Sequence, residues 1–212
     1  MSLVITTYDW VPDFAIGYVR DLRPRWACAE AGLDYSIETT SVREKTPEHF
    51  ARQPFGQVPI LRDGDLSVFE SGAILLYLGE RAGTLLPKSP APRAETQQWL
   101  IASLNTLEPA VMALALARIF DRDAQAAERA LPRLRDRLGQ LSTVLERRDF
   151  IAAGRFTIAD IMLTEVLRIA QSLDALADYP VLSDYVARMT ARPAFQRAHA
   201  AQLAHFAPPT GR

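Results

Sequence analysis

Residues 55–81 read FGQVPILRDGDLSVFESGAILLYLGER, and this stretch decides the fold. Two short strand-like runs flank Asp63-Gly64, a dipeptide typical of a tight β-hairpin turn. Val58-Pro59 opens the hairpin, and Glu70-Ser71 stands directly before an apolar helix that we expect over residues 72–81. The stretch therefore predicts two antiparallel strands followed by a helix.

Upstream of the hairpin, the chain alternates between strand and helix patterns. Residues 3–8 (LVITTY) are β-branched and apolar, which predicts a buried strand, and residues 34–40 (DYSIETT) alternate as a second strand does. A helical pattern between them ends at Gly32, and Thr46 followed by Pro47 is typical of a helix start. The order β-α-β-α-β-β-α predicts one mixed four-stranded sheet with three helices.

Downstream of the hairpin, the strand patterns end. Residues 83–93 are rich in proline and polar residues, which predicts a linker. Residues 94–212 contain helical patterns rich in Ala, Leu and Arg, and we expect Pro109 to kink or break the first of them. We therefore predict an α/β domain over residues 1–82 and an all-helical domain over residues 94–212.

The composition is that of an ordinary soluble globular protein. The chain has 212 residues, of which 49% are hydrophobic, and its net charge of −1 argues against a general nucleic-acid binder. We read no signal peptide and no apolar run as long as the roughly 18 residues of a membrane span, so we expect a cytoplasmic protein without membrane contact. Cys28 and the three histidines lack the spacing of a zinc site, so we expect no metal, and Cys28 is expected to be buried and inert.

Val58-Pro59 allows two interpretations. Proline lacks a backbone donor, so it can simply begin a strand. Alternatively the peptide bond is cis, which proline adopts at low cost. A cis bond would turn the N–H and C=O of Val58 toward an open edge, where an extended peptide could pair with them.

Glu70-Ser71 also allows two interpretations. Ser71 is placed to be the N-cap of the following helix, but a cap hydroxyl beside the first N–H groups of a helix also makes an anion site. Glu70 suits a ligand that carries an ammonium next to a carboxylate, as the end of an α-amino acid does. Together with the edge at Val58, the pair predicts a short peptide ligand such as glutathione.

The stretch PFGQVPIL…VFESGAILLYLGER resembles the glutathione-binding core of the cytosolic glutathione transferase family. Residues 156–163 (FTIADIML) are similar to the capping motif of that family's C-terminal domain, and Thr157 and Asp160 have the spacing of a capping box. The resemblance implies a thioredoxin-like first domain, an all-helical second domain and a cis proline. It also implies the glutathione-binding residues Gln57, Val58, Pro59, Glu70 and Ser71.

The resemblance does not supply the group that activates the glutathione thiol. Ungapped matching places Arg20 and Asp21 where many bacterial and zeta-like members carry Ser or Cys. We consider Tyr8 at the end of the first strand, then Arg20, which could stabilise a thiolate electrostatically, and then Tyr18. Each could equally be a packed or solvated side chain, and Asp21 is interpreted as structural.

Other contacts follow only loosely from the resemblance. Arg43, Lys45 and Gln57 could meet the glycine carboxylate of glutathione, or could be solvated surface residues. The pocket for the electrophile is expected between the domains, although an apolar position at helical spacing is more often core. The candidates for its lining are Trp10, Phe14, Val111, Met112, Ala115 and Ile119.

Two functions remain open from the sequence. The first is a transferase that adds the glutathione thiolate to a small apolar electrophile, or a close relative that isomerises or reduces one. The second is a non-catalytic glutathione-binding or protein-interaction module. The resemblance also implies a homodimer. Residues 1–85 carry a net charge of −4 and residues 86–212 one of +3, which favours two-fold packing of unlike halves.

Overall fold

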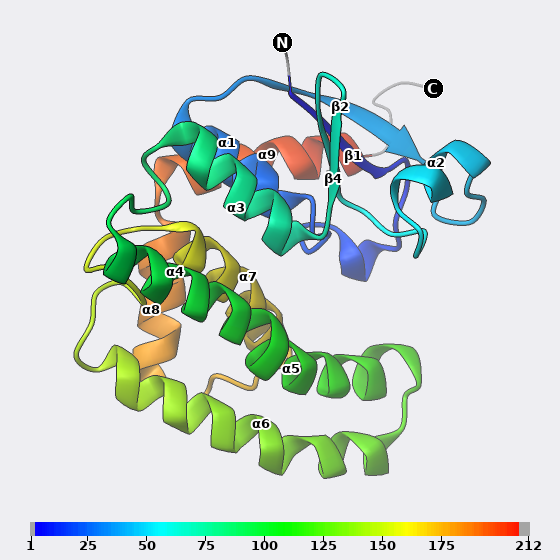
Figure 1. The fold of residues 1–212 in the computed structure, drawn as a ribbon. Coiled ribbons are helices and arrows are strands. Elements are labelled where there is room, and N and C mark those ends of the chain that lie inside the picture. The colour runs from blue at the N-terminus through cyan, green and yellow to red at the C-terminus, as the bar shows by residue number, and fades with distance from the viewer. Residues whose placement is uncertain (1–2, 208–212) are drawn as a thin grey trace. The chain divides into compact units, whose positions relative to one another are not determined.

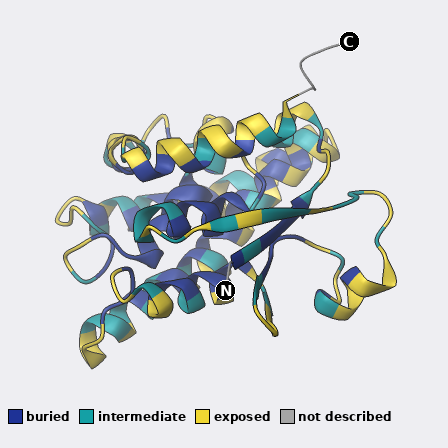
Figure 2. Cartoon of the chain, turned by 90° about the horizontal axis from the view of Figure 1, so that it is seen from above, coloured by how far each residue is buried: buried dark blue, intermediate teal, exposed yellow. Residues whose placement is uncertain are grey.

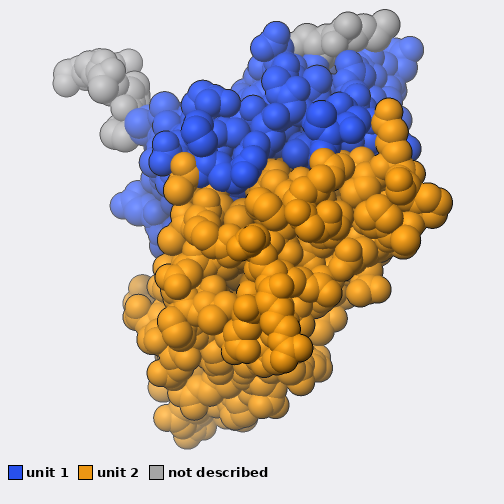
Figure 3. Space-filling model, turned by 90° about the vertical axis from the view of Figure 1, so that its left-hand side faces the viewer, with its two compact units in different colours: residues 1–85, 192–212 blue, residues 86–191 orange. Residues whose placement is uncertain are grey.

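The computed structural model describes residues 3–207. Its contacts divide the chain into two compact units, which Figure 3 distinguishes by colour. The first unit is Met1–Leu85 with Arg192–Arg212, and the second is Leu86–Ala191.

The first unit contains a mixed four-stranded sheet in the order β2-β1-β3-β4 (Figure 1). Strand β1 runs parallel to β2 and antiparallel to β3, and β3 runs antiparallel to β4. These pairings confirm the sheet that the hairpin and the helical crossover predict. The strands are β1 Leu3–Tyr8, β2 Tyr35–Thr40, β3 Ile60–Asp63 and β4 Leu66–Phe69.

Four helices accompany this sheet. Helix α1 packs against both α3 and α9, and buries Trp26 completely. The Trp26 ring meets that of Phe195 edge-on, with their centroids 4.9 Å apart. The Thr46 hydroxyl accepts a hydrogen bond from the N–H of His49, as expected for a helix start. The helices are α1 Leu22–Ala31, α2 Pro47–Arg52, α3 Ser71–Ala82 and α9 Pro193–Phe206.

Polar contacts from Gln202 and His205 are among those that fasten α9 to the rest of the first unit. Gln202 donates to the Asp21 carboxylate at 2.5 Å and to the Val19 carbonyl at 2.9 Å. His205 donates to the Tyr8 carbonyl at 2.9 Å. The sequence analysis grouped residues 94–212 in one helical domain, because periodicity does not tell which neighbour a helix packs against. The contacts place α9 in the first unit instead, while the predicted linker limits stay a prediction.

The second unit consists of helices. A continuous helix from Pro90 to Phe120 comprises α4 (Pro90–Ala102), a π-helical turn at Ser103–Leu107, α5 (Glu108–Ala115) and a second π-helical turn. Pro109 was expected to kink or break this helix, and it does not break it. A π-helical turn lies directly before Pro109 and accommodates the missing donor within the helix. The remaining helices are α6 Ala124–Leu145, α7 Ile158–Ser172 and α8 Pro180–Thr190.

The long first helix of this unit departs from one expectation of the sequence analysis. The helix Pro90–Phe120 is long and apolar enough to cross a membrane by length and composition, with a mean hydropathy of 1.6 in its best window. Half of that window is buried inside the protein. A single helix of this kind is weak evidence for a membrane span, because the core helices of soluble proteins have the same composition.

A capping box begins α7, as predicted. The Thr157 side chain accepts a bond from the helix backbone, and Asp160 accepts from the Thr157 N–H at 2.8 Å. Asp160 also accepts from the N–H of Ile151 at 2.9 Å and the hydroxyl of Tyr185 at 2.8 Å. All of these groups are buried. Figure 2 colours the buried residues of the chain dark blue. Asp160 therefore joins three segments of the second unit.

Candidate functional site

The site begins at the entry to β3. The Val58-Pro59 peptide bond is cis, which confirms that prediction. Val58 is buried, and its backbone makes no hydrogen bond to any of residues 3–207. Its N–H and C=O therefore stay available to an extended ligand, as expected for a strand that is added to a sheet.

At the other end of the hairpin, Glu70 has an unusual backbone conformation. Its φ is 68° and its ψ is 118°, in a region that residues with a Cβ rarely adopt. The Glu70 side chain is exposed and makes no capping hydrogen bond. A strained residue persists only where the surrounding structure holds it, and such residues cluster at ligand sites.

Ser71 does not cap the helix, contrary to one of the two interpretations of the sequence. Helix α3 begins at Ser71 itself, so Glu70 occupies the N-cap position. The Ser71 hydroxyl accepts a hydrogen bond from Nη1 of Arg23 at 2.9 Å, and both side chains are buried. The sequence analysis missed Arg23. The sequence shows Arg23 only as one of several arginines in a helical pattern, and the structure shows that the residues from Leu22 to Cys28 are all buried.

Tyr8 lies close to the start of the hairpin. It packs against the buried cluster of Val11, Val19 and Val58, and its hydroxyl makes no hydrogen bond to the part of the chain that the structure describes. Burial raises the pKa of Tyr8, while the charge of Arg20 opposes this shift. The hydroxyl therefore keeps its proton at neutral pH and can act as a hydrogen-bond donor.

Two cations lie near aromatic rings of this region. The Lys45 ammonium is 4.7 Å from the centroid of the Tyr8 ring, and the Arg43 guanidinium is 5.3 Å from that of Trp10. Lys45 also donates to the Ser41 carbonyl. Burial lowers the pKa of Lys45, and Asp9 opposes the shift. The structure thus places Lys45 beside Tyr8, whereas Arg43 stands over Trp10.

The structural role of Asp21 depends on internal hydrogen-bond partners and not on the helix dipole. It is fully buried and accepts from Nε of Arg25 at 2.6 Å and from Gln202 at 2.5 Å. Burial raises the pKa of Asp21, while the charge and hydrogen bond of Arg25 oppose this. The carboxylate is therefore held by internal partners and supports the packing of α1 and α9.

Cys28 is buried, and burial raises the pKa of its thiol to about 12. A thiol with such a pKa carries almost no thiolate at neutral pH, so the expectation of an inert cysteine is confirmed. Among residues 3–207, no group of three or more His, Cys, Asp or Glu side chains could hold a metal ion.

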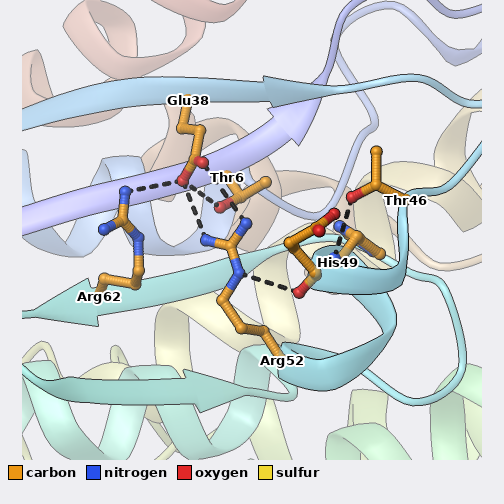
Figure 4. Close-up of polar contacts among 7 residues, drawn as sticks. Thr6, Glu38, Thr46, His49, Arg52 and Arg62 are labelled. Atoms are coloured by element: carbon orange, nitrogen blue, oxygen red, sulfur yellow. Dashed lines mark hydrogen bonds and ion pairs between the residues drawn. The ribbon is translucent and has the colours of Figure 1, made fainter.

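Helix α2 is held against the sheet by a charged cluster around Glu38 (Figure 4). Arg62 donates to Glu38 at 2.8 Å and Arg52 at 3.2 Å. Burial raises the pKa of Glu38, but the hydrogen bonds from the two arginines outweigh it and lower the pKa below its ordinary value. Buried His49 of the same helix donates to the Gln57 carbonyl at 3.1 Å. The Glu38 cluster holds α2, and His49 ties α2 to Gln57 at the entry to the hairpin. The sequence did not predict this role for His49.

The predicted lining residues of the electrophile pocket belong to both units, and their role in that pocket stays a prediction. Trp10 and Phe14 are about half exposed in the first unit, at 51% and 49%. The other four residues belong to the second unit, where Val111 and Ala115 are buried. An apolar pocket of about 220 Å³ in the second unit lies between the helix segment 99–107, α6 and α7, and none of the predicted residues lines it.

Two family models match the chain. The model of the glutathione S-transferase N-terminal domain matches residues 4–80, and that of the C-terminal domain matches residues 101–193. Glutathione S-transferase 3 of Zea mays is 31% identical over 188 residues, which cover 81% of this chain and 85% of the relative. Glutathione S-transferase F10 of Arabidopsis thaliana is 30% identical over 141 residues, which cover 59% of this chain and 66% of the relative.

Solved structures share the fold across nearly the whole chain. A glutathione transferase family member from Pseudomonas fluorescens, with two glutathione molecules bound, is 27% identical with a TM-score of 0.82. The match covers 93% of this chain and 92% of that protein. A glutathione transferase from Burkholderia graminis, with two glutathione molecules per subunit, is 26% identical with a TM-score of 0.82. That match covers 99% of this chain and 90% of the other.

Proposed function

Because this chain belongs to the glutathione S-transferase family, we propose that it binds glutathione and adds the glutathione thiolate to a small apolar electrophile. The observation that carries the proposal is the junction of Glu70 and Ser71. Ser71 does not cap its helix, and Glu70 holds a backbone conformation that costs on the order of 1–3 kcal/mol. Neither feature is needed by a helix that serves the fold alone.

Each end of the hairpin has a role in this proposal. The carboxylate of the γ-glutamyl group accepts from the Ser71 hydroxyl and from the first N–H groups of α3. Its ammonium pairs with the Glu70 carboxylate. The cysteinyl backbone of glutathione pairs with Val58 as a short added strand, next to Pro59. Gln57, which follows α2 in the chain, flanks this edge.

The cations near α2 complete the peptide site. The glycine carboxylate of glutathione is paired with Lys45 or Arg43, on the side of the hairpin that the Glu38 cluster supports. The two solved structures that contain glutathione support a glutathione site in this protein. A homodimer, a cytoplasmic location and the lack of nucleic-acid or membrane partners stay predictions.

The chemistry requires a thiolate. A free thiol has a pKa of about 8.5, so only a few per cent of it is ionised at pH 7. In the proposed reaction a hydroxyl donates to the sulfur and lowers that pKa, and the thiolate then forms a bond to the electrophilic carbon while the leaving group departs with its electron pair. Tyr8 is the first candidate, because its hydroxyl keeps its proton and has no internal partner among residues 3–207.

A non-catalytic glutathione-binding module is the second candidate function. It is favoured by Arg20 and Asp21, which stand where the resemblance implies a serine or cysteine activator. Asp21 is engaged by Arg25 and Gln202. Retention on glutathione resin, followed by a conjugation assay with an aromatic halide, separates the two. We expect retention with halide release; retention alone would favour the module, and no retention would contradict both.

Ser71→Ala is expected to weaken glutathione binding by about 1.5–3 kcal/mol, which is roughly 10- to 150-fold, because one charge-assisted hydrogen bond is lost. Calorimetry measures the affinity. Ser67→Ala, which removes an exposed hydroxyl from the neighbouring strand, is the matched control. An unchanged affinity for Ser71→Ala would show that the hydroxyl does not contact the ligand.

Tyr8→Phe is expected to raise the pKa of bound glutathione toward the free value of about 8.5 and to leave affinity within about twofold, because only the donor to the sulfur is removed. The pH dependence of thiolate absorbance measures this pKa. Tyr179→Phe, which removes a tyrosine hydroxyl from the second unit, is the matched control. If Arg20→Ala raises the pKa and Tyr8→Phe does not, activation is electrostatic.

A further inference from the structure

Arg23 is a buried arginine whose side chain reaches from one helix to the start of another. It lies in the first turn of α1, is 1% exposed, and donates from Nη1 to the Ser71 hydroxyl at 2.9 Å. Helices α1 and α3 pack against each other, so the contact is part of the interior of the first unit. Ser71 itself is 5% exposed, at the first position of α3.

The contact fixes the direction in which the Ser71 hydroxyl can donate. A guanidinium has five N–H donors and no acceptor, so the hydroxyl oxygen must accept from Arg23. The single proton of the hydroxyl then points elsewhere. Among the residues that the structure describes, Arg23 is the one partner of the Ser71 hydroxyl. The hydroxyl proton therefore makes no bond to a helix carbonyl or to a neighbouring side chain. The O–H therefore remains available for an acceptor outside the protein interior.

The contact also places a positive charge behind the start of α3. Arginine stays protonated at any pH at which proteins fold, and a charge acts more strongly in the interior than in water. The helix N-terminus adds its own partial positive charge at the same place. A hydroxyl that accepts from a cation is a stronger donor, since hydrogen bonds in a chain polarise one another. The positive charge at the start of α3 and the polarised hydroxyl both favour an anionic acceptor over a neutral one.

We propose that Arg23 is a positioning residue that selects the free α-carboxylate of the γ-glutamyl group, because it orients and polarises the Ser71 hydroxyl. This inference rests on the proposed function, since it assumes that glutathione binds at Ser71. Arg23 does not touch the ligand and acts through the hydroxyl. Its contribution therefore depends on the carboxylate of the ligand, whereas a contact that merely joins two helices supports every ligand alike.

The test compares two ligands on the wild-type protein and three variants by calorimetry. The ligands are glutathione and 4-aminobutyryl-Cys-Gly, which has the same backbone but lacks the α-carboxylate. Arg23→Met removes the charge and the donors, Arg23→Gln keeps a neutral donor, and Arg23→Lys keeps the charge. Thermal unfolding of each variant reports its stability separately.

The expected result is a change in the ratio of the two affinities. Arg23→Met is expected to weaken glutathione about tenfold or more and the decarboxylated ligand less than about twofold, because a charge-assisted bond is stronger than a neutral one. Arg23→Lys should restore part of the ratio, and Arg23→Gln less of it. An equal loss for both ligands, or no loss for glutathione, would overturn the proposal.

A second variant keeps the proposal testable if the Arg23 variants do not fold. Ser71→Ala must lower the same ratio, because Arg23 acts through that hydroxyl, and an equal effect on both ligands would overturn the proposal without any change at Arg23. In variants that fold, Arg23→Met should lower the ratio less when added to Ser71→Ala than it does in the wild-type protein, because the hydroxyl that it polarises is already absent. A wild-type protein that binds neither ligand would contradict the proposed function itself, whereas binding with an unchanged ratio contradicts only the role of Arg23.

Discussion

Asp21→Ser is expected to destabilise the protein by about 3–5 kcal/mol rather than create a thiol activator, because it leaves the buried Arg25 without its carboxylate. Asp21 and Arg25 are 0% and 2% exposed at their side chains, and their charged atoms are 2.6 Å apart. Breaking such a pair is costly since the remaining charge stays out of water. The substitution also removes the acceptor of Gln202 on α9.

Chemical unfolding in urea measures the loss. Asp34→Ser, at an exposed position just before β2, is the matched control and should stay within about 0.5 kcal/mol of the wild type. Asp21→Leu combined with Arg25→Met removes both charges and should be more stable than Asp21→Ser alone, because neither partner is then buried without the other. A stable Asp21→Ser variant with a lowered thiol pKa would contradict this interpretation of the position.

Asp160→Ala is expected to destabilise the second unit by about 3–5 kcal/mol, because several buried donors lose their acceptor at once and each costs about 1–3 kcal/mol. These donors are the N–H groups of Ile151 and Thr157 and the hydroxyl of Tyr185. Burial raises the pKa of Asp160, but the hydrogen bonds from these donors oppose the shift. For a chain of this length, the loss corresponds to a fall in Tm of roughly 10 °C.

Scanning calorimetry checks the Tm. Asp184→Ala removes an exposed carboxylate next to Tyr185 and should leave the Tm nearly unchanged. Asp160→Asn keeps one acceptor oxygen and should fall between the wild type and the alanine variant. If Asp160→Ala unfolds at the same temperature as Asp184→Ala, the network does not carry the stability assigned to it.

The parts of the molecule that could be predicted from the sequence depend on residues that are close together along the chain. The Asp63-Gly64 turn fixes an antiparallel hairpin, and the capping box depends on two residues three positions apart. The cis bond before Pro59 follows from the residue type and the resemblance. In each case the interaction spans a few residues, so the local pattern contains the information.

The contacts that the sequence did not reveal join distant segments. Arg23 and Ser71 are 48 residues apart, and Asp21 and Gln202 are 181 apart. A pattern along the chain does not tell which buried arginine meets which hydroxyl, since helix periodicity identifies a face and not its partner. For the same reason the place of α9 in the first unit was missed. Ser71 was assigned to the site, but the direction of its hydroxyl depends on Arg23.

The attachment of α9 has a consequence for how the protein is made. The sheet and the hairpin are synthesised before the second unit, whereas Gln202 and His205 are synthesised after it. Domains otherwise tend to fold in order from the N-terminus during synthesis. Here the first unit lacks α9 until the whole second unit has been synthesised, and Asp21 has no Gln202 until then. A fragment that ends before Pro193 would lack this support, so residues 1–85 on their own are a poor substitute for the intact first unit.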